Sequence, residues 1–284
     1  MNKTCKLVKK IELLLKQLNC REYLHQFGPK KFKTIQHLFA LLFMQIAKLS
    51  FRRASELLVM LNFEVPSYSA LCKSRARIPI HLWNSALKIT SGLSSVNVAI
   101  DSTGISRMNP SYHYIKRIDD DQPIKSYVKL SAFFCIENRK FLALRVRAKP
   151  RHDVKDFDYL FKQNHDFQNL FADSAYDSEK IHEKLYWSGI QAIIKPKKRT
   201  KRGFFRKKQM EKYSTKLYHQ RSLIESGWSS LKRKYGGYTL TKNYQSARAE
   251  LYLKAIAFNL SLLQRDFQQS RLIIKLFKHI KPEE

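Results

Sequence analysis

The chain has 284 residues, enough to bury the core of one large domain or of two smaller ones, and its hydrophobic fraction of 44% argues against disorder. Its 54 Lys and Arg residues against 23 Asp and Glu residues give a formal net charge of +31. Self-repulsion of that size opposes compaction, so the composition predicts a polyanionic partner, of which nucleic acid is the commonest. Charge alone leaves open a merely basic protein or one associated with ribosomes.

Cysteine usage and hydropathy predict where the protein resides. The four cysteines are scattered and form no CxxC pair, which predicts neither a zinc ribbon nor a disulfide framework. Lysines interrupt the start of the chain, where a secretory signal would need an apolar stretch. The longest apolar run, residues 37–49, is shorter than the roughly 20 residues that span a bilayer. We therefore expect a cytoplasmic, nucleoid-associated protein with no membrane partner.

Residues 1–92 are expected to form an all-helical N-terminal region. Two segments with helical periodicity, 50–58 and 67–77, flank a turn at Pro66. The second segment carries Lys73 and Arg75, which suits a helix-turn-helix whose second helix contacts DNA. Plain helical packing is the alternative interpretation.

A small, polar linker at residues 91–95 separates this region from a second one, residues 93–284, in which the hydrophobic period changes. The pattern predicts, in order, strands at 96–100, 125–136 and 140–147, a helix at 153–163, a strand at 169–172, a helix at 178–187, a strand at 191–194, a basic loop at 195–208, and helices at 214–234 and 247–264. Three strands followed by alternating helices and strands fit an α/β fold with a mixed sheet and helices against its faces.

Two aspartates, Asp101 and Asp173, directly follow predicted strands. A side chain at a strand end is exposed at the sheet edge while its backbone stays fixed, which suits a metal ligand. An aspartate that caps the next turn or helix is the common alternative.

The predicted helix at 214–234 carries a polar stripe of Tyr218, Arg221, Glu225 and Lys232. At about 100° per residue, these four side chains fall within roughly 60° of one another around the helix axis. An apolar stripe adjoins them, made of Leu217, Ile224, Trp228 and Leu231. We expect the apolar stripe to pack on the sheet and the polar stripe to face the two strand-end aspartates. A solvated ion pair between Arg221 and Glu225 is the simpler interpretation.

The spacing Tyr218-x2-Arg221-x3-Glu225-x6-Lys232 resembles the YREK signature of the DDE transposases of bacterial and archaeal insertion sequences. The run that begins at Asp101 is similar to the context of the first catalytic aspartate in that superfamily. Residues 151–153 and 171–177 are similar to the region around the second. The resemblance spans roughly residues 66–263. It implies a ribonuclease-H-like catalytic domain after the helical DNA-binding region, with Asp101, Asp173 and Glu225 as the acidic triad.

The activity that the resemblance implies is metal-dependent cleavage of transposon-end DNA, followed by joining of the 3′-hydroxyl end to target DNA. Converging carboxylates repel one another unless a cation compensates them, and hard oxygen ligands select Mg²⁺ or Mn²⁺. Two such ions about 3.5–4 Å apart activate the attacking oxygen and stabilise the leaving one. The expected metal ligands are Asp101, Asp173 and Glu225. The expected partners are double-stranded DNA, as transposon ends and target, and a second copy of the chain in the synaptic complex.

The remaining candidate DNA contacts are basic or aromatic. Arg221 and Lys232 suit phosphate binding, and Tyr218 offers stacking or a hydroxyl donor. The basic loop is expected to follow DNA phosphates through Lys197, Lys198, Arg199 and Arg202. Two alternatives stay open: a catalytically silent DNA-binding protein derived from a transposase, and a ribonuclease-H-like nuclease without strand transfer.

Overall fold

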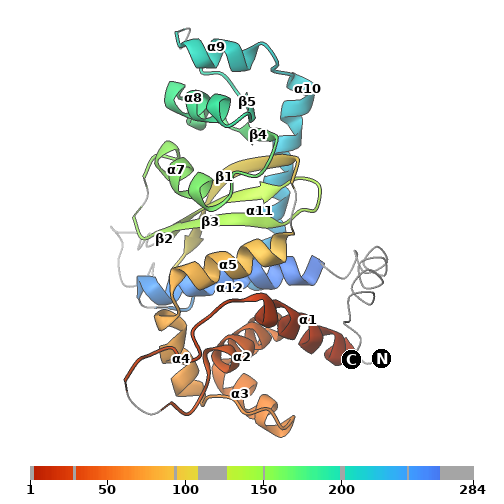
Figure 1. Ribbon diagram of the computed structural model, residues 1–284, viewed down its shortest axis with the longest axis vertical. Helices are drawn as coiled ribbons and strands as arrows, with labels where there is room; N and C mark the ends of the chain where they lie inside the picture. Colours follow the sequence, from red (N-terminus) through yellow and green to blue (C-terminus); the bar gives the residue numbers. More distant parts are fainter. Residues whose placement is uncertain are drawn as a thin grey trace, which may run out of the picture.

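The computed structural model describes residues 3–27, 30–92, 95–107, 127–149, 151–198, 202–241 and 243–262, with side chains from residue 8 onward. Most of the N-terminal helices lie at one end of the long axis, the sheet lies in the middle, and a group of short helices lies at the other end (Figure 1). The N-terminal helices are α1 (Lys3–Gln17), α2 (Thr34–Ala47), α3 (Phe51–Met60), α4 (Tyr68–Arg77) and α5 (Ile80–Ser91).

The two helices predicted on either side of Pro66 are α3 and α4, and each begins at a serine cap. Ser50 Oγ accepts a hydrogen bond from the backbone N–H of Arg53 at 3.3 Å, and Ser67 Oγ accepts one from Ala70 at 3.4 Å. These bonds satisfy N–H groups that have no partner inside the first helical turn. The helix pair predicted from the sequence is therefore confirmed.

The sheet has five strands in the order β3-β2-β1-β4-β5. They are β1 (Asn97–Ser106), β2 (Tyr127–Cys135), β3 (Phe141–Arg147), β4 (Asn169–Ala172) and β5 (Gln191–Ile194). β1, β2 and β3 pair antiparallel, whereas β4 and β5 join β1 in parallel. Parallel strands need crossover connections, which α7 (Val154–Gln163) and α8 (Glu179–Trp187) supply. This mixed sheet with flanking helices is the ribonuclease-H-like fold class predicted from the sequence.

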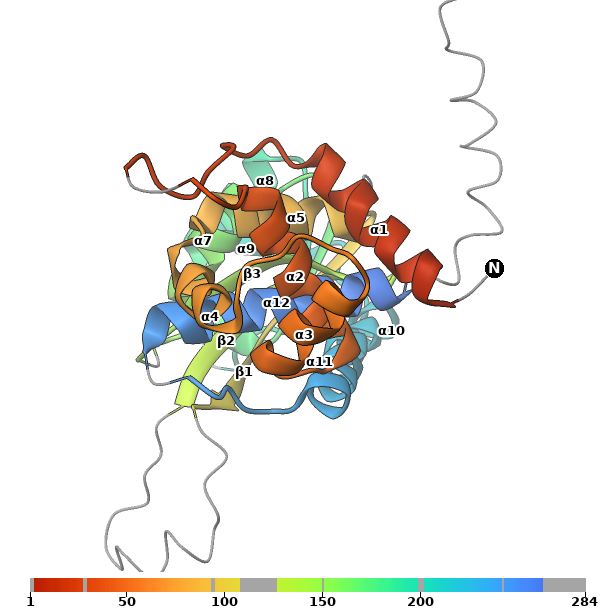
Figure 2. The ribbon, with the colours of Figure 1, turned by 90° about the horizontal axis from the view of Figure 1, so that it is seen from below.

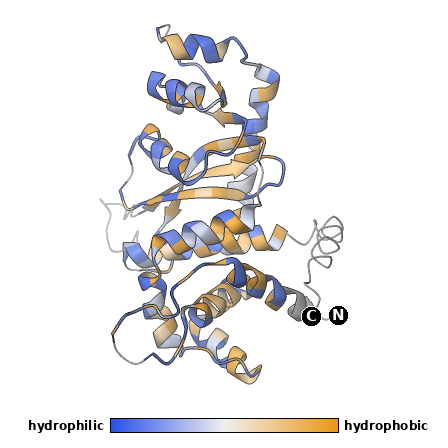
Figure 3. Ribbon diagram, viewed as in Figure 1, coloured by the Kyte–Doolittle hydropathy of each residue, from blue (hydrophilic) through white to orange (hydrophobic). Residues whose placement is uncertain are grey.

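Side chains of β1 alternate between two hydrophobic clusters. Val98 and Ile100 belong to the cluster that includes residues of α7 and α8, whereas Ala99 and Ile105 belong to the other cluster. The second face is covered by α11 (Ser222–Tyr235), α12 (Tyr244–Leu262) and α5. The strands are mainly hydrophobic and the helices at the far end are mainly hydrophilic (Figure 3).

One hydrophobic cluster crosses the boundary expected at residue 92. α12 contacts α2, α4, α5 and β3, so it packs against both the N-terminal helices and the sheet. Seen from below, α12 runs behind α2 and α3 (Figure 2). The predicted boundary falls at the end of α5, yet the cluster includes Leu41 of α2, Trp83 of α5 and Trp228 of α11. The helical region and the sheet therefore share one core.

Three sequence-based boundaries are wrong. β1 does not end before Asp101 but continues to Ser106, because β2 pairs with it along its whole length. The helix predicted at 214–234 is divided into α10 (Thr215–Tyr218), the 3-10 turn η2 (His219–Arg221) and α11. Part of the predicted basic loop is a short helix, α9 (Phe204–Met210).

No single helix among the described residues has both the length and the apolar composition needed to cross a membrane. α2 and α3 pass that test only as a pair, with a bend of 110° between them. Most of α2 is buried inside the protein, from Leu38 to Met44.

Candidate active site

Asp101 in β1 and Asp173, the residue directly after β4, are brought to the same corner by the pairing of these two strands. β1 and β4 pair in parallel up to Ala99 and Phe171, so two further residues along each strand bring the chain to Asp101 and Asp173. Asp101 is paired with β2 through Ala132 but lies beyond the end of the β1–β4 ladder. By strand alternation it points to the same face as Ala99, which is the face that α11 covers. Asp173 Oδ1 accepts a hydrogen bond from the backbone N–H of Ser174 at 2.7 Å.

Arg221 and Glu225 reach this corner from η2 and α11. Arg221 Nη2 donates to Glu225 Oε1 at 2.5 Å across one helical turn. Burial opposes the charge on Arg221, yet Tyr218 and three carboxylates raise the pKa of its guanidinium above the ordinary value. Those carboxylates belong to Glu225, Asp101 and Asp173. One guanidinium thus interacts electrostatically with all three members of the predicted triad.

The electrostatics of Asp101 lead to the same arrangement. Burial is the largest influence and raises the pKa of its carboxyl group, since the charged form loses hydration. A hydrogen bond from the backbone of Ser102 and the charge of Arg221 oppose that shift, whereas Glu225 and Asp153 reinforce it. The pKa of Asp101 is raised overall. An added cation would therefore stabilise the ionised form of this carboxyl group.

The three carboxylates fit a hard divalent cation by their chemistry. Within the described ranges, no group of three or more His, Cys, Asp or Glu side chains is arranged closely enough to hold a metal ion. In α11, the Glu225 carboxylate is instead paired with Arg221. The Arg221 guanidinium itself marks a place where positive charge is favoured among carboxylate oxygens, which are the donors that Mg²⁺ and Mn²⁺ prefer.

Lys232 fixes α11 to the strand that carries Asp101. Its Nζ donates to Thr103 Oγ1 at 2.6 Å, and burial lowers the pKa of the Lys232 ammonium. Thr103 lies two residues after Asp101, so its side chain is on the same face of β1. The lysine of the predicted polar stripe is therefore at the site, although the helix is divided. In the predicted apolar stripe, Leu217 is exposed. The three members that lie on α11, namely Ile224, Trp228 and Leu231, are buried.

The opposite face of β1 carries a charged network that the sequence analysis missed. Ser102 Oγ donates to Asp153 Oδ1 at 2.7 Å, and Lys129 Nζ pairs with the same oxygen at 2.6 Å and with Asp156 Oδ2 at 3.2 Å. Asp156 is fully buried and is also paired with Arg147. The sequence did contain one indication of this network: Lys129 stands alone within the apolar segment of β2, and a buried lysine needs an acidic partner. This network joins β1 and β2 to the start of α7, on the face of β1 opposite to Asp101.

Two acids, one just before α8 and one in its first turn, bind the basic segment and the first turn of α9. Asp177 is buried and accepts from Arg206 Nε at 2.7 Å and from the backbone N–H of Lys197 at 2.8 Å. Glu179 accepts from the backbone N–H groups of Phe205 and Arg206, which begin α9. Three of the predicted DNA contacts here are exposed, namely Lys197, Lys198 and Arg202. The fourth, Arg199, lies outside the described residues.

The predicted DNA contacts on α4 have different surroundings. Lys73 is exposed, as a phosphate contact would need to be. Arg75 is buried, its Nη1 pairs with Glu250 Oε2 at 3.4 Å, and its guanidinium lies over the Phe51 ring. Arg75 therefore does not share the exposed position of Lys73, because Glu250 of α12 pairs with it inside the protein, and a contact of Arg75 with DNA stays a prediction.

A family model described as "Transposase DDE domain" matches residues 94–260, more than half of the chain. The chain belongs to this family, whose members normally use divalent metals. Among solved structures, the chain is similar to a piggyBac transposase in a synaptic complex with hairpin DNA. The TM-score is 0.49 and the sequence identity is 9%, over 94% of this chain and 73% of that chain. A search of curated protein sequences finds no match.

Proposed function

We propose that this protein is a DDE transposase that cleaves transposon-end DNA hydrolytically and joins the resulting 3′-hydroxyl to target DNA. Membership of the transposase DDE domain family supports the reaction class. One observation supports the assignment to these residues: parallel pairing of β1 with β4 brings Asp101 and Asp173 to one corner of the sheet, and Arg221, which pairs with Glu225, contributes to the electrostatics of Asp101 there.

In this proposal the three carboxylates hold two divalent cations, Mg²⁺ or Mn²⁺. When bound, such ions lower the pKa of an attacking water and stabilise charge on the leaving oxygen. Asp101 is fixed by β2 pairing, and Asp173 by its hydrogen bond to Ser174, so two ligands are oriented before DNA arrives. Glu225 completes the set when its carboxylate leaves Arg221.

Arg221, Lys232 and Tyr218 hold the DNA strand at this corner. The Arg221 guanidinium binds phosphate oxygens through two parallel hydrogen bonds and offsets the charge that develops at phosphorus. Lys232 adds a second positive charge on α11, and Tyr218 offers its ring for stacking. In the first reaction, water attacks phosphorus and the 3′-oxygen leaves as a hydroxyl group. In the second, that 3′-hydroxyl attacks a target phosphodiester and displaces its 3′-oxygen.

Further phosphate contacts come from the exposed cations Lys197, Lys198, Arg202 and Lys73. Two copies of the chain hold the two ends of one transposon in a synaptic complex. The protein acts in the cytoplasm, on the DNA of the nucleoid.

The test is Mg²⁺-dependent nicking of a supercoiled plasmid, followed by strand transfer from precut ends taken from the genomic flanks of the reading frame. Asp101→Ala, Asp173→Ala and Glu225→Ala should each slow nicking by on the order of a thousandfold or more, because several kcal/mol of charge stabilisation is lost. DNA affinity in EDTA should stay close to that of the wild type.

Glu183→Gln is the matched control, because Glu183 is an exposed carboxylate on α8 away from the site. It should nick at the wild-type rate. A Glu225→Ala variant that nicks as fast as the control would refute the assignment. Nicking without strand transfer would reduce the proposal to a nuclease, and DNA binding without nicking would reduce it to a silent DNA-binding protein.

A further inference from the structure

A cavity of about 690 Å³ lies where the N-terminal helices meet the end of α11. Its walls come from the end of α2, the start of α3, α4, the C-terminal end of α11 and α12. In the view from below, α2 and α3 are drawn in front of α12 (Figure 2). The cavity is separate from the carboxylate corner, since neither Asp101, Asp173 nor Glu225 lines it.

The charged lining of this cavity is strongly positive. It consists of five cations and one carboxylate, namely Lys48, Arg75, Arg233, Lys234, Lys254 and Glu250. Glu250 is already shared, because Arg75 Nη1 lies at 3.4 Å and Lys254 Nζ at 3.2 Å. Within the described part of the chain, no acidic side chain forms an ion pair with Lys48, Arg233 or Lys234. These three positive charges therefore line the cavity without a counterion among the described residues.

Two features make the positive lining a built site as well as a charged surface. Arg75 is buried, and its Nε has no hydrogen-bond partner among the described residues. Lys254 is also buried and donates to the carbonyl oxygens of Gly236 and Tyr238, just after α11. Burial, with the nearby charge of Lys48, lowers the pKa of Lys234. Like charges held together and partly desolvated are costly, and a bound anion offsets that cost.

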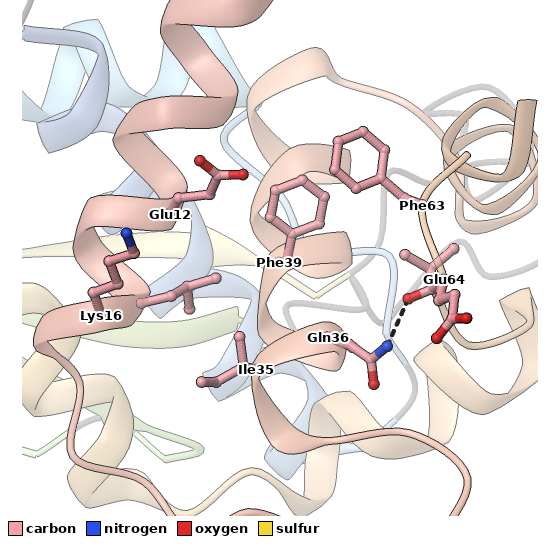
Figure 4. A pocket seen from close by; sticks show the side chains of 9 residues that line it. Glu12, Lys16, Ile35, Gln36, Phe39, Phe63 and Glu64 are labelled. Carbon is pink, nitrogen blue, oxygen red and sulfur yellow. Dashed lines mark hydrogen bonds between the residues drawn. The ribbon is translucent and has the colours of Figure 1, made fainter. Parts of the chain in front are cut away.

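A second cavity, in the helical region, has a different lining. It has a volume of about 510 Å³ and lies between α1, α2 and the segment after α3 (Figure 4). Its charged side chains are Glu12, Lys16 and Glu64, and its walls include Ile35 and Phe39. The two cavities therefore differ in the charge of their lining, although both lie against the helical region.

We propose that the cavity lined by Lys48, Arg233 and Lys234 binds the phosphodiester backbone of DNA at a second position, outside the carboxylate corner. This inference rests on the proposed function, because it concerns the path of the same DNA. α11 connects the two positions, with Glu225 at one end, Lys232 between, and Lys234 at the other. The rise from residue 225 to residue 234 is about 14 Å, or about four nucleotide steps along one strand of a duplex.

The experiment compares two double variants that remove the same charge. Lys48→Gln with Lys234→Gln changes the cavity, and Lys9→Gln with Lys16→Gln changes exposed lysines on α1. Binding of a short fluorescent DNA duplex is measured by anisotropy over a range of salt concentrations in EDTA. The cavity variant should flatten the slope of log affinity against log salt by about 1.8, or about 0.9 for each lost phosphate contact. The α1 variant should leave the slope nearly unchanged.

Arg233→Gln is a second, single-site variant in the same cavity and should flatten the slope by about 0.9. An unchanged slope in both cavity variants, or an equal change in the α1 variant, would overturn the inference. The inference would also be overturned if the cavity variants changed the salt slope for binding of an RNA duplex but not for binding of the DNA duplex. Inorganic phosphate that binds the wild type in the cavity, with no change in the DNA slope, would assign the cavity to a small anion and also overturn it.

The failure of this inference is distinguishable from that of the proposed function. If the wild-type protein nicks and joins DNA while the cavity variants bind DNA with the wild-type salt dependence, only the inference of a second DNA-binding position fails. If the wild-type protein binds no DNA, both the proposed function and the second DNA-binding position fail.

Discussion

The carboxyl group of Asp101 is held in surroundings that disfavour its charge. Burial raises its pKa first, and Glu225 and Asp153 add to that effect, while Arg221 only partly opposes it. A raised pKa means that the folded protein holds a proton that the unfolded chain has already released. The free energy of unfolding must therefore fall as pH rises from near the ordinary value of 3.8 through the raised value.

Asp101→Asn should thus stabilise the metal-free protein at neutral pH, because it removes a partly desolvated negative charge and replaces the side chain by one of nearly the same size and shape. The difference in thermal unfolding midpoint should vanish as pH falls to about 3.8. Scanning fluorimetry in EDTA over that pH range measures it. Excess Mg²⁺ should narrow or reverse the gap, since the wild type alone gains from the ion. A metal-free variant less stable than the wild type at pH 7 would contradict this account of Asp101.

Lys129 has the opposite role on the other face of β1, where it compensates two carboxylates. Lys129→Met leaves the charges of Asp153 and Asp156 without this partner, and removing one member of a buried pair typically costs about 3–5 kcal/mol. Urea unfolding should report a loss of that order. Lys184→Met is the control, because its pair with Asp158 is much more exposed and should matter by less than about 1 kcal/mol. Equal losses in the two variants would mean that the Lys129 network is not buried in solution.

At the scale of elements, the position of α11 depends on a glycine. A Cβ atom added at Gly227 would lie 2.6 Å from Cε2 and 2.8 Å from Cζ of Phe134 in β2. Phe134 is buried and packs edge-to-face against Phe141, so its ring cannot move freely. α11 therefore packs closely on the sheet at this point, two residues from Glu225.

Gly227→Ala should destabilise the protein by about 1–3 kcal/mol through overpacking and should also slow DNA nicking by displacing Glu225. Adding Phe134→Leu should restore part of both losses, because the smaller side chain makes room for the new methyl group. Gly237→Ala is the control, since a Cβ atom added at Gly237 would lie 3.6 Å from its nearest neighbour, an atom of the Lys232 side chain. A Gly227→Ala variant with wild-type stability and nicking would show that close packing of α11 is unimportant.

The elements that could be predicted are those whose signal is local. The strands at 169–172 and 191–194 are short apolar runs between polar residues, and their bounds agree with the prediction. The limits of β1 and α9 depend on distant partners. β1 continues past Asp101 because β2 pairs with it, and α9 begins where Glu179, in the first turn of α8, accepts its first N–H groups.

The candidate site divides in the same way. The order of Asp101, Asp173 and Glu225 and the helical spacing around Glu225 are local patterns, and together with the resemblance to the DDE transposases they led to the predicted triad, although Asp101 lies inside β1 and not at its end. The burial of Arg75 was not readable, since its partner Glu250 lies 175 residues further along the chain. The Lys129 network was missed for the same reason, as its acids come from the start of α7 and the residue before it.

At the scale of the whole molecule, the shared core predicts cooperative unfolding. α12 packs against the N-terminal helices and β3 together, and one hydrophobic cluster includes Trp83 and Trp228. Urea unfolding followed by tryptophan fluorescence and by far-ultraviolet circular dichroism should therefore give one transition with one midpoint. Two separated transitions would instead mean that the segments before and after residue 92 fold independently.

The most direct test of the central claim is iron-mediated cleavage of the protein chain. Fe²⁺ replaces the divalent cation, and ascorbate with peroxide generates radicals that cut the backbone close to the bound ion. In the presence of DNA, we predict cuts at three separated segments, around Asp101 in β1, after β4 at Asp173, and around Glu225 in α11, all suppressed by excess Mg²⁺ and lost in Asp101→Asn. Cuts near Asp101 and Asp173 without any near Glu225, or cuts that Asp101→Asn does not remove, would contradict a shared metal site.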